Sequence, residues 1–128
     1  MTDIREPWIE LQAVDAQKNV IARYGGPGKD GLLPQTAARL GMDIAKPDGT
    51  LLFQHELSES TRVPFDRRVR SGAALDFVLP APAALPTGAT ELHAVLLYRN
   101  VKTAYLRAAT GDPAATAPEV EAARTVVK

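Results

Sequence analysis

Two histidines are the residues of this chain whose side chains could act as ligands or bases near neutral pH. Their positions, His55 and His93, match no zinc-binding histidine spacing. His93 alternates with apolar residues between Glu91 and Arg99, which predicts a core histidine satisfied by a hydrogen bond. His55 adjoins Glu56 ahead of a polar stretch, so we expect it at the surface and take it as the candidate ligand.

Three serines are the candidate nucleophiles, because Ser58, Ser60 and Ser71 lie near His55 or Asp66 in the sequence. A hydrolase needs a nucleophile, a base and an orienting acid within hydrogen-bond reach. No nucleophile elbow surrounds any of the three. We therefore assign no catalytic residue and expect a protein that is not an enzyme.

A cluster of charges is the candidate surface for a partner, and it comprises Asp66, Arg67, Arg68 and Arg70. Arginines steadied by an aspartate can bind a carboxylate or phosphate in bidentate fashion. The alternative is a set of solvated ion pairs that keeps a sheet edge from aggregating.

Composition excludes several classes of function. Lys plus Arg and Asp plus Glu both total 15, so the net charge of zero disfavours nucleic acid and anionic lipid as partners. The chain has no cysteine, which removes thiolate metal sites and covalent haem attachment, and we assign no metal site. No apolar run is long enough to span a bilayer, and the charged start, Met1 to Glu6, lacks the apolar region of a secretory signal.

The elements that must position these residues are mostly strands. Alternation over Trp8–Val14 predicts a half-buried strand, which a polar turn joins to Val20–Tyr24 as a hairpin. A flexible glycine-rich loop, Gly25–Leu33, follows; it lacks the Lys-Ser or Lys-Thr pair of a phosphate loop, and the sequence leaves open whether it orders on binding a ligand. Further strands are predicted at Arg39–Ile44, Thr50–Phe53, Ala73–Leu79, Glu91–Arg99 and Val120–Val127.

Two segments are predicted to be something other than ordinary strands. Gln54–Arg70 is expected to be an extended crossing, in which Pro64 argues against a central strand. Val101–Ala109 is expected to form a short helix. Six or seven short strands without repeated long helices predict an all-β fold, an immunoglobulin-like antiparallel β-sandwich with one short helix near residues 101–109. At 128 residues, we expect a single domain covering 1–128.

Several stretches resemble a known family. The first matching stretches are Arg5-Glu6-Pro7-Trp8-Ile9-Glu10-Leu11, Val14-Asp15-Ala16 and Val20-Ile21. The later ones are His55-Glu56-Leu57, Pro64-Phe65-Asp66-Arg67-Arg68-Val69, Gly88-Ala89, Leu97-Tyr98-Arg99 and Tyr105. This pattern resembles the carboxyl-terminal β-sandwich domain of secreted bacterial multihaem c-type cytochromes. The chain departs from the family in lacking haem-attachment motifs and the Gly-His-x-Phe-Pro-Thr-Gly-like segment before the first strand, and in having Lys18 where the family has a turn glycine.

The resemblance implies an accessory role without catalysis, in which the sandwich shields the haems of an associated chain or segment, or docks a redox partner. It implies a periplasmic or extracellular protein, since c-type haem is attached outside the cytoplasm, and it makes His55 a candidate axial haem ligand. The alternative is a stand-alone immunoglobulin-like adhesion or carbohydrate-binding module. That alternative needs exposed aromatic residues, which are scarce here.

Overall fold

The computed structural model describes residues 5–34, 36–45, 51–52, 62–67 and 72–127, with side chains for 5–34, 36–40 and 72–127. The chain divides into two compact units. The helical unit comprises residues 1–7, 39–76 and 99–118, and the core unit comprises residues 8–38, 77–98 and 119–128. The expectation of one domain over 1–128 stays a prediction.

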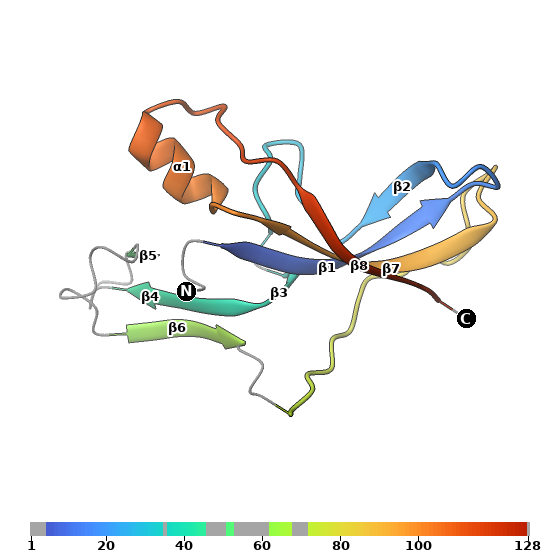
Figure 1. Cartoon of the computed structure of the whole chain (residues 1–128), viewed down its shortest axis with the longest axis horizontal. Coiled ribbons are helices and arrows are strands. Elements are labelled where there is room, and N and C mark those ends of the chain that lie inside the picture. The colour runs from blue at the N-terminus through green and yellow to red at the C-terminus, as the bar shows by residue number, and fades with distance from the viewer. Residues whose placement is uncertain (1–4, 35, 46–50, 53–61, 68–71, 128) are drawn as a thin grey trace. The chain divides into compact units, whose positions relative to one another are not determined.

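The larger sheet contains both long strands of the chain (Figure 1). Its strand order is β2-β1-β7-β8, with β3 paired to β1, and its members are β1 (Glu6–Val14), β2 (Val20–Tyr24), β3 (Ala38–Arg39), β7 (Glu91–Arg99) and β8 (Val120–Val126). Strands β1 and β2 form the predicted antiparallel hairpin, and β8 pairs antiparallel with β7. This sheet carries the buried residues described below.

The β1–β2 turn closes on the side chain of Asp15. Its Oδ1 accepts hydrogen bonds from the backbone N–H groups of Gln17 (3.0 Å) and Asn19 (2.8 Å). Lys18 has a φ of 68°, a left-handed conformation that glycine adopts most readily. The position at which this chain departs from the family pattern therefore keeps the backbone geometry of a glycine.

The apolar core of the core unit is small and centres on Trp8. Trp8, Val95 and Leu97 form one buried cluster, against which Leu33 packs from the loop after β2. Leu33 thus anchors the end of the loop that we expected to be a flexible exit.

The smaller sheet has the order β5-β4-β6, with β4 at Gly41–Ala45, β5 at Leu51–Leu52 and β6 at Arg62–Arg67. Both pairings of β4 are antiparallel. Strand β6 lies within the predicted crossing, and its register against β4 shifts beside Pro64. An edge strand with an irregular register tolerates proline, because proline lacks the N–H that a regular ladder needs.

The helix α1 spans Thr103–Thr110, close to the predicted 101–109. It ends at Gly111, which adopts the left-handed conformation (φ 72°) and donates its N–H to the Arg107 carbonyl at 2.9 Å. The described part of the chain holds no helix long and apolar enough to cross a membrane.

The predicted class is confirmed, because the structure is mostly antiparallel β-sheet with one short helix, as expected for an all-β, sandwich-like fold. The predicted strand at Ala73–Leu79 is wrong, since this segment has no regular secondary structure. Neither face is fully buried: Phe77 and Leu79 are partly buried, but Leu75, predicted on the same face, is 42 % exposed. Alternation alone cannot make a strand without a partner to complete the backbone ladder.

Candidate functional site

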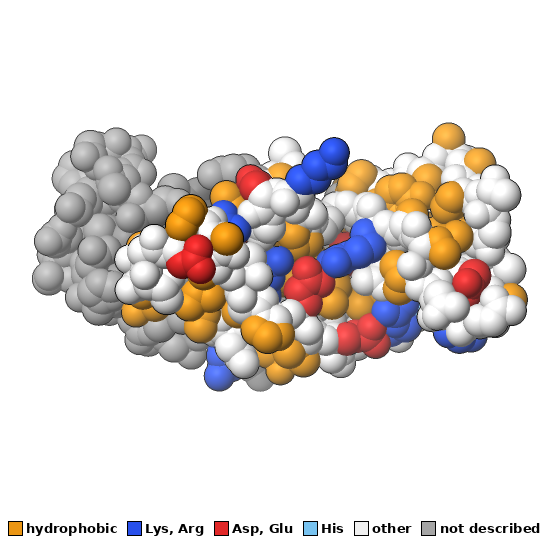
Figure 2. Space-filling view, turned by 90° about the horizontal axis from the view of Figure 1, so that it is seen from above, with side chains coloured by type: hydrophobic (Ala, Val, Ile, Leu, Met, Phe, Trp, Pro, Cys, Tyr) orange, Lys and Arg blue, Asp and Glu red, His pale blue; other side chains and the backbone are white. Residues whose placement is uncertain are grey.

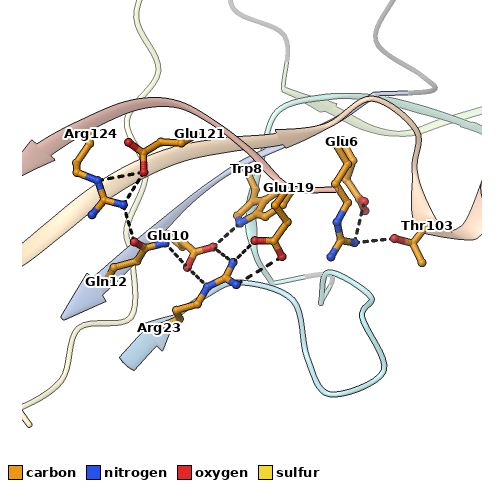
Figure 3. A network of polar contacts seen from close by, with 10 residues as sticks. Glu6, Trp8, Glu10, Gln12, Arg23, Thr103, Glu119, Glu121 and Arg124 are labelled. Atoms are coloured by element: carbon orange, nitrogen blue, oxygen red, sulfur yellow. Dashed lines mark hydrogen bonds and ion pairs between the residues drawn. The ribbon is translucent and has the colours of Figure 1, made fainter. Parts of the chain in front are cut away.

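A buried carboxylate lies at the centre of the candidate site. Glu10 is fully buried in β1 on the same strand face as Trp8 and Gln12, so the expectation of a half-buried strand is wrong for this end of the sheet. Trp8 Nε1 donates to Glu10 Oε1 at 2.9 Å, and Gln12 Nε2 donates to Glu10 Oε2 at 3.2 Å (Figure 3). The strand therefore supplies two of the donors that the buried charge needs.

Arg23 of β2 supplies the remaining donors and the opposite charge. Its Nε donates to Glu10 Oε2 at 2.6 Å and its Nη2 donates to Glu10 Oε1 at 2.5 Å, a bidentate pair. The same guanidinium reaches Glu119 Oε2 at 2.8 Å (Figure 3). One arginine thus joins β1, β2 and the residue that precedes β8.

These contacts keep both Glu10 and Arg23 in their charged forms. Burial by itself would raise the pKa of Glu10, but hydrogen bonds from Arg23, Trp8 and Gln12 outweigh it and hold that pKa below its ordinary value. Hydrogen bonds to Glu10 and Glu119 raise the pKa of Arg23. Glu10 is therefore a carboxylate at neutral pH, and each of its oxygens accepts two hydrogen bonds.

A glycine closes over this carboxylate. A Cβ atom at Gly26 would lie 2.7 Å from Glu10 Oε1, closer than real Cβ atoms approach a heavy atom. Gly26 is needed here for space, since its φ lies outside the left-handed region. The loop after β2 can cover Glu10 only because this position has no side chain.

A second set of polar contacts continues from Gln12 to the histidine of β7. Arg124 of β8 donates from Nη2 to Gln12 Oε1 at 2.8 Å, and its Nη1 lies 2.9 Å from His93 Nδ1. His93 Nε2 lies 2.8 Å from Glu91 Oε2. Because a guanidinium has only donors, Nδ1 of His93 accepts and Nε2 carries the proton. This confirms the prediction of a buried, hydrogen-bonded His93.

Acidic side chains at the rim complete this second set. Lys18 Nζ donates to Glu91 Oε1 at 2.9 Å, and Arg124 Nε donates to Glu121 Oε1 at 3.1 Å. Hydrogen bonds from His93 and Lys18 lower the pKa of Glu91, and the bond from Arg124 lowers the pKa of Glu121. Figure 2 shows acidic and basic side chains beside one another on the described surface, as such pairing predicts.

The helical unit holds a second carboxylate, that of the partly buried Glu6. Arg99, which is 3 % exposed, donates to the Thr103 hydroxyl at 2.6 Å and lies 3.5 Å from Glu6 Oε2. The backbone N–H of Thr103, the first residue of α1, donates to Glu6, so this carboxylate caps the helix. Burial outweighs Arg99, Thr103, Lys102 and Arg39 and raises the pKa of Glu6.

Most of the residues predicted to carry function do not belong to the polar networks described above. His55, Ser58, Ser60, Ser71, Arg68 and Arg70 lie outside the described residues. Asp66 and Arg67 lie on β6, an edge of the smaller sheet, opposite Met42 and Gly41 of β4. Their role in binding a partner stays a prediction. Among the described residues, no group of three or more histidine, aspartate or glutamate side chains is placed to hold a metal ion.

Sequence reasoning missed the network around Glu10 because it took acidic and amide residues on a strand as solvent-facing. The signal available was an acid two residues after the chain's one tryptophan, together with an arginine near the middle of the next predicted strand. In the hairpin register Arg23 lies opposite Gln12, and the Arg23 side chain reaches diagonally to Glu10, two residues along β1.

The arrangement can hold strands together, since the oxygens of Glu10 and both ring nitrogens of His93 are engaged within the chain. It links β1, β2, β7 and β8 through charge-assisted hydrogen bonds. A histidine with both nitrogens engaged does not fit the role of a haem or metal ligand. The polar network among the described residues therefore holds the strands together. His93 is not available in it as a haem ligand.

Comparison with known proteins supports the fold. No protein-family model and no curated protein matches this chain. A crystal structure of a penta-heme cytochrome c552 from Thermochromatium tepidum is similar to it, with a TM-score of 0.58 and 16 % sequence identity. The likeness covers 98 % of this chain and 31 % of the cytochrome chain. At this identity the comparison shows a shared fold, so nearly all of this chain has the fold of a part of that cytochrome.

Proposed function

We propose that this chain is a non-catalytic β-sandwich module associated with a multihaem c-type cytochrome, where it shields haems or docks a redox partner in electron transfer. The observation that carries the proposal is the likeness of 98 % of the chain to a part, 31 % in length, of a penta-heme cytochrome. The family resemblance of the sequence points to the same class independently of the structure.

The chemistry of the chain supports an accessory role. The chain has no cysteine, so it forms no thioether to haem, and the haems belong to an associated chain or segment. The polar groups at its centre are used to fix strands, which suits a rigid packing module. Because c-type haem is attached outside the cytoplasm, the proposal places the protein in the periplasm or outside the cell.

The first experiment measures haem in the protein as its native host makes it. The polypeptide or complex that contains this chain is isolated, and its covalent haem is measured by the pyridine haemochrome spectrum and by mass. We expect several c-type haems for each copy of the chain. A haem-free native protein contradicts the proposal and favours a stand-alone immunoglobulin-like module.

The second experiment tests His55 as an axial haem ligand within the same native protein. Reduced-minus-oxidised spectra and reduction potentials are compared for wild type and His55→Ala, with Glu56→Ala as the control next to it in sequence. We expect a spectral change in His55→Ala alone. Identical spectra remove the ligand role while leaving the accessory role standing.

The third experiment tests the charge cluster Asp66, Arg67, Arg68 and Arg70 as a docking surface. We expect Arg68→Glu to slow electron exchange with an acidic redox partner and to reduce its dependence on ionic strength. Asp30→Lys, a charge change elsewhere in the chain, is the control. Equal rates in wild type and Arg68→Glu contradict this surface.

A further inference from the structure

Strand β8 is an open edge of the larger sheet. It stands last in the order β2-β1-β7-β8, and no further strand pairs with it in the described ranges. All seven of its residues are exposed, including Val120 (37 %) and Val126 (50 %). An exposed strand edge offers a row of backbone donors and acceptors to another extended chain.

The register shows which backbone groups face the open side. The N–H of Val127 donates to the Leu92 carbonyl at 2.8 Å, and Thr125 lies opposite Ala94. In an antiparallel ladder, alternate residues direct their N–H and C=O groups toward the same neighbour. Thr125 therefore bonds toward β7 like Val127, while Arg124 and Val126 direct their backbone groups to the open edge.

Only part of this edge is regular. The pairing of β7 and β8 shifts between Leu96 and Leu97, so Ala122 is an extra residue in β8. Such a bulge disrupts the ladder and blunts an edge against pairing. The five residues after it, 123–127, keep a constant register and are free of any bulge.

We propose that a second copy of this chain pairs through this segment, with its own β8 running antiparallel across the two-fold axis at Thr125. In this register Arg124 of each copy lies opposite Val126 of the other, and the four outward backbone groups of each copy form two pairs of hydrogen bonds with those of the other. The neighbouring two-fold register centred on Arg124 would oppose two guanidinium groups, which is unfavourable. Like-charge repulsion thus favours the register centred on Thr125 over the one centred on Arg124.

Side chains on the sheet surface fit the same partner. A mostly apolar groove of about 230 Å³ is lined by residues of three strands of the core unit, Ile9, Ala94, Leu96, Ala123, Arg124 and Thr125. Ala123 and Thr125 are alternate residues of β8, so pairing across Thr125 continues this apolar lining into the second copy. The chain has no net charge, so no long-range repulsion opposes the approach of two copies.

The area that the β8–β8 contact would bury indicates how tightly the two copies should bind. Five residues of strand bury less than the roughly 1,200 Å² of a standard stable interface, so we expect a weak dimer. The dimer is independent of the proposed role beside a cytochrome, and either proposal can fail alone.

Sedimentation velocity and backbone amide exchange of the full chain test the proposal. From about 10 μM to about 1 mM, a range that spans a weak dissociation constant, we expect the monomer to convert to a dimer. The amides of Arg124 and Val126 should become protected with rising concentration, while those of Thr125 and Val127 are protected throughout. A monomer at every concentration overturns the proposal and leaves the edge to a different polypeptide.

A proline substitution isolates the backbone contact. Val126→Pro removes an N–H that faces away from β7, so the β7–β8 pairing is kept. We expect its dimer dissociation constant to rise by at least about tenfold. Val126→Ala keeps the N–H and serves as the control for the lost side chain. A dimer that survives Val126→Pro with the chain folded, or whose protected amides lie outside β8, overturns the proposal.

Discussion

A buried glutamate and a partly buried glutamate on one strand behave in opposite ways. Glu10 and Glu6 both lie on β1, and burial raises the pKa of each. Four hydrogen bonds, two of them from Arg23, lower the pKa of Glu10 below its ordinary value. Glu6 has Arg99 at 3.5 Å and the helix N-terminus, and its pKa stays raised. Burial therefore disfavours the ionised form of both glutamates, and the hydrogen bonds from neighbouring groups decide whether the ionised form is favoured in the end.

The largest effect that tests this comparison is expected for Glu10→Gln. All four groups around Glu10 are donors, so an amide NH₂ would face two of them and leave Glu119 as the remaining charge partner of Arg23. We expect the free energy of unfolding to fall by about 2–4 kcal/mol, below the upper range for buried pairs because Arg23 is 38 % exposed. Urea denaturation measures it. Glu119→Gln is the control, with an expected loss under about 1 kcal/mol.

The next effect concerns the glycine above Glu10. Gly26→Ala places a Cβ 2.7 Å from Glu10 Oε1 and must displace the carboxylate or the loop. We expect a loss of about 1–3 kcal/mol, as for overpacking a filled site. Gly28→Ala is the matched control, because its nearest neighbour is the end of the Asp30 side chain at 3.2 Å. Similar stabilities for the two variants, measured by thermal unfolding, count against a close-packed lid on Glu10.

The glutamates with shifted pKa values should change the free energy of unfolding with pH in two opposite directions. The lowered pKa of Glu10 stabilises the fold above the unfolded-state value of about 4.3, and this contribution is lost as pH falls through the folded-state pKa. Glu91 and Glu121 act in the same direction. The raised pKa of Glu6 acts oppositely, so its contribution is lost as pH rises above about 4.3. Urea denaturation between about pH 3 and 7 tests this, since Glu10→Gln should flatten the acid-side loss.

The smallest effect is expected for Glu6→Gln. The amide oxygen can still accept the Thr103 N–H, and the cost of burying the charge is removed. The loss of attraction to Arg99 opposes this gain, so the free energy of unfolding should change by less than about 1 kcal/mol at pH 7. A loss equal to that of Glu10→Gln would show that the two carboxylates are equivalent after all.

The sequence predicted most of the described strands well. Trp8–Val14, Val20–Tyr24 and Glu91–Arg99 are strands because alternation and turn residues are local properties. The error at Ala73–Leu79 arose because alternation was taken without evidence of a pairing partner. The candidate site was predicted only at His93, since its apolar neighbours marked it as buried. Glu10, Arg23 and Arg124 were missed because their pairing depends on partners from other strands.

The amino-acid sequence by itself determined the all-β class, the hairpin and the lack of cysteine chemistry, because each of these follows from neighbouring residues or from composition. Only the tertiary structure decided which charges are buried and paired. Arg23 is 13 residues from Glu10 and 96 residues from Glu119 in the chain, yet it bonds to both. A charge can be buried only where such distant donors converge on it, and that convergence is a property of the assembled sheet.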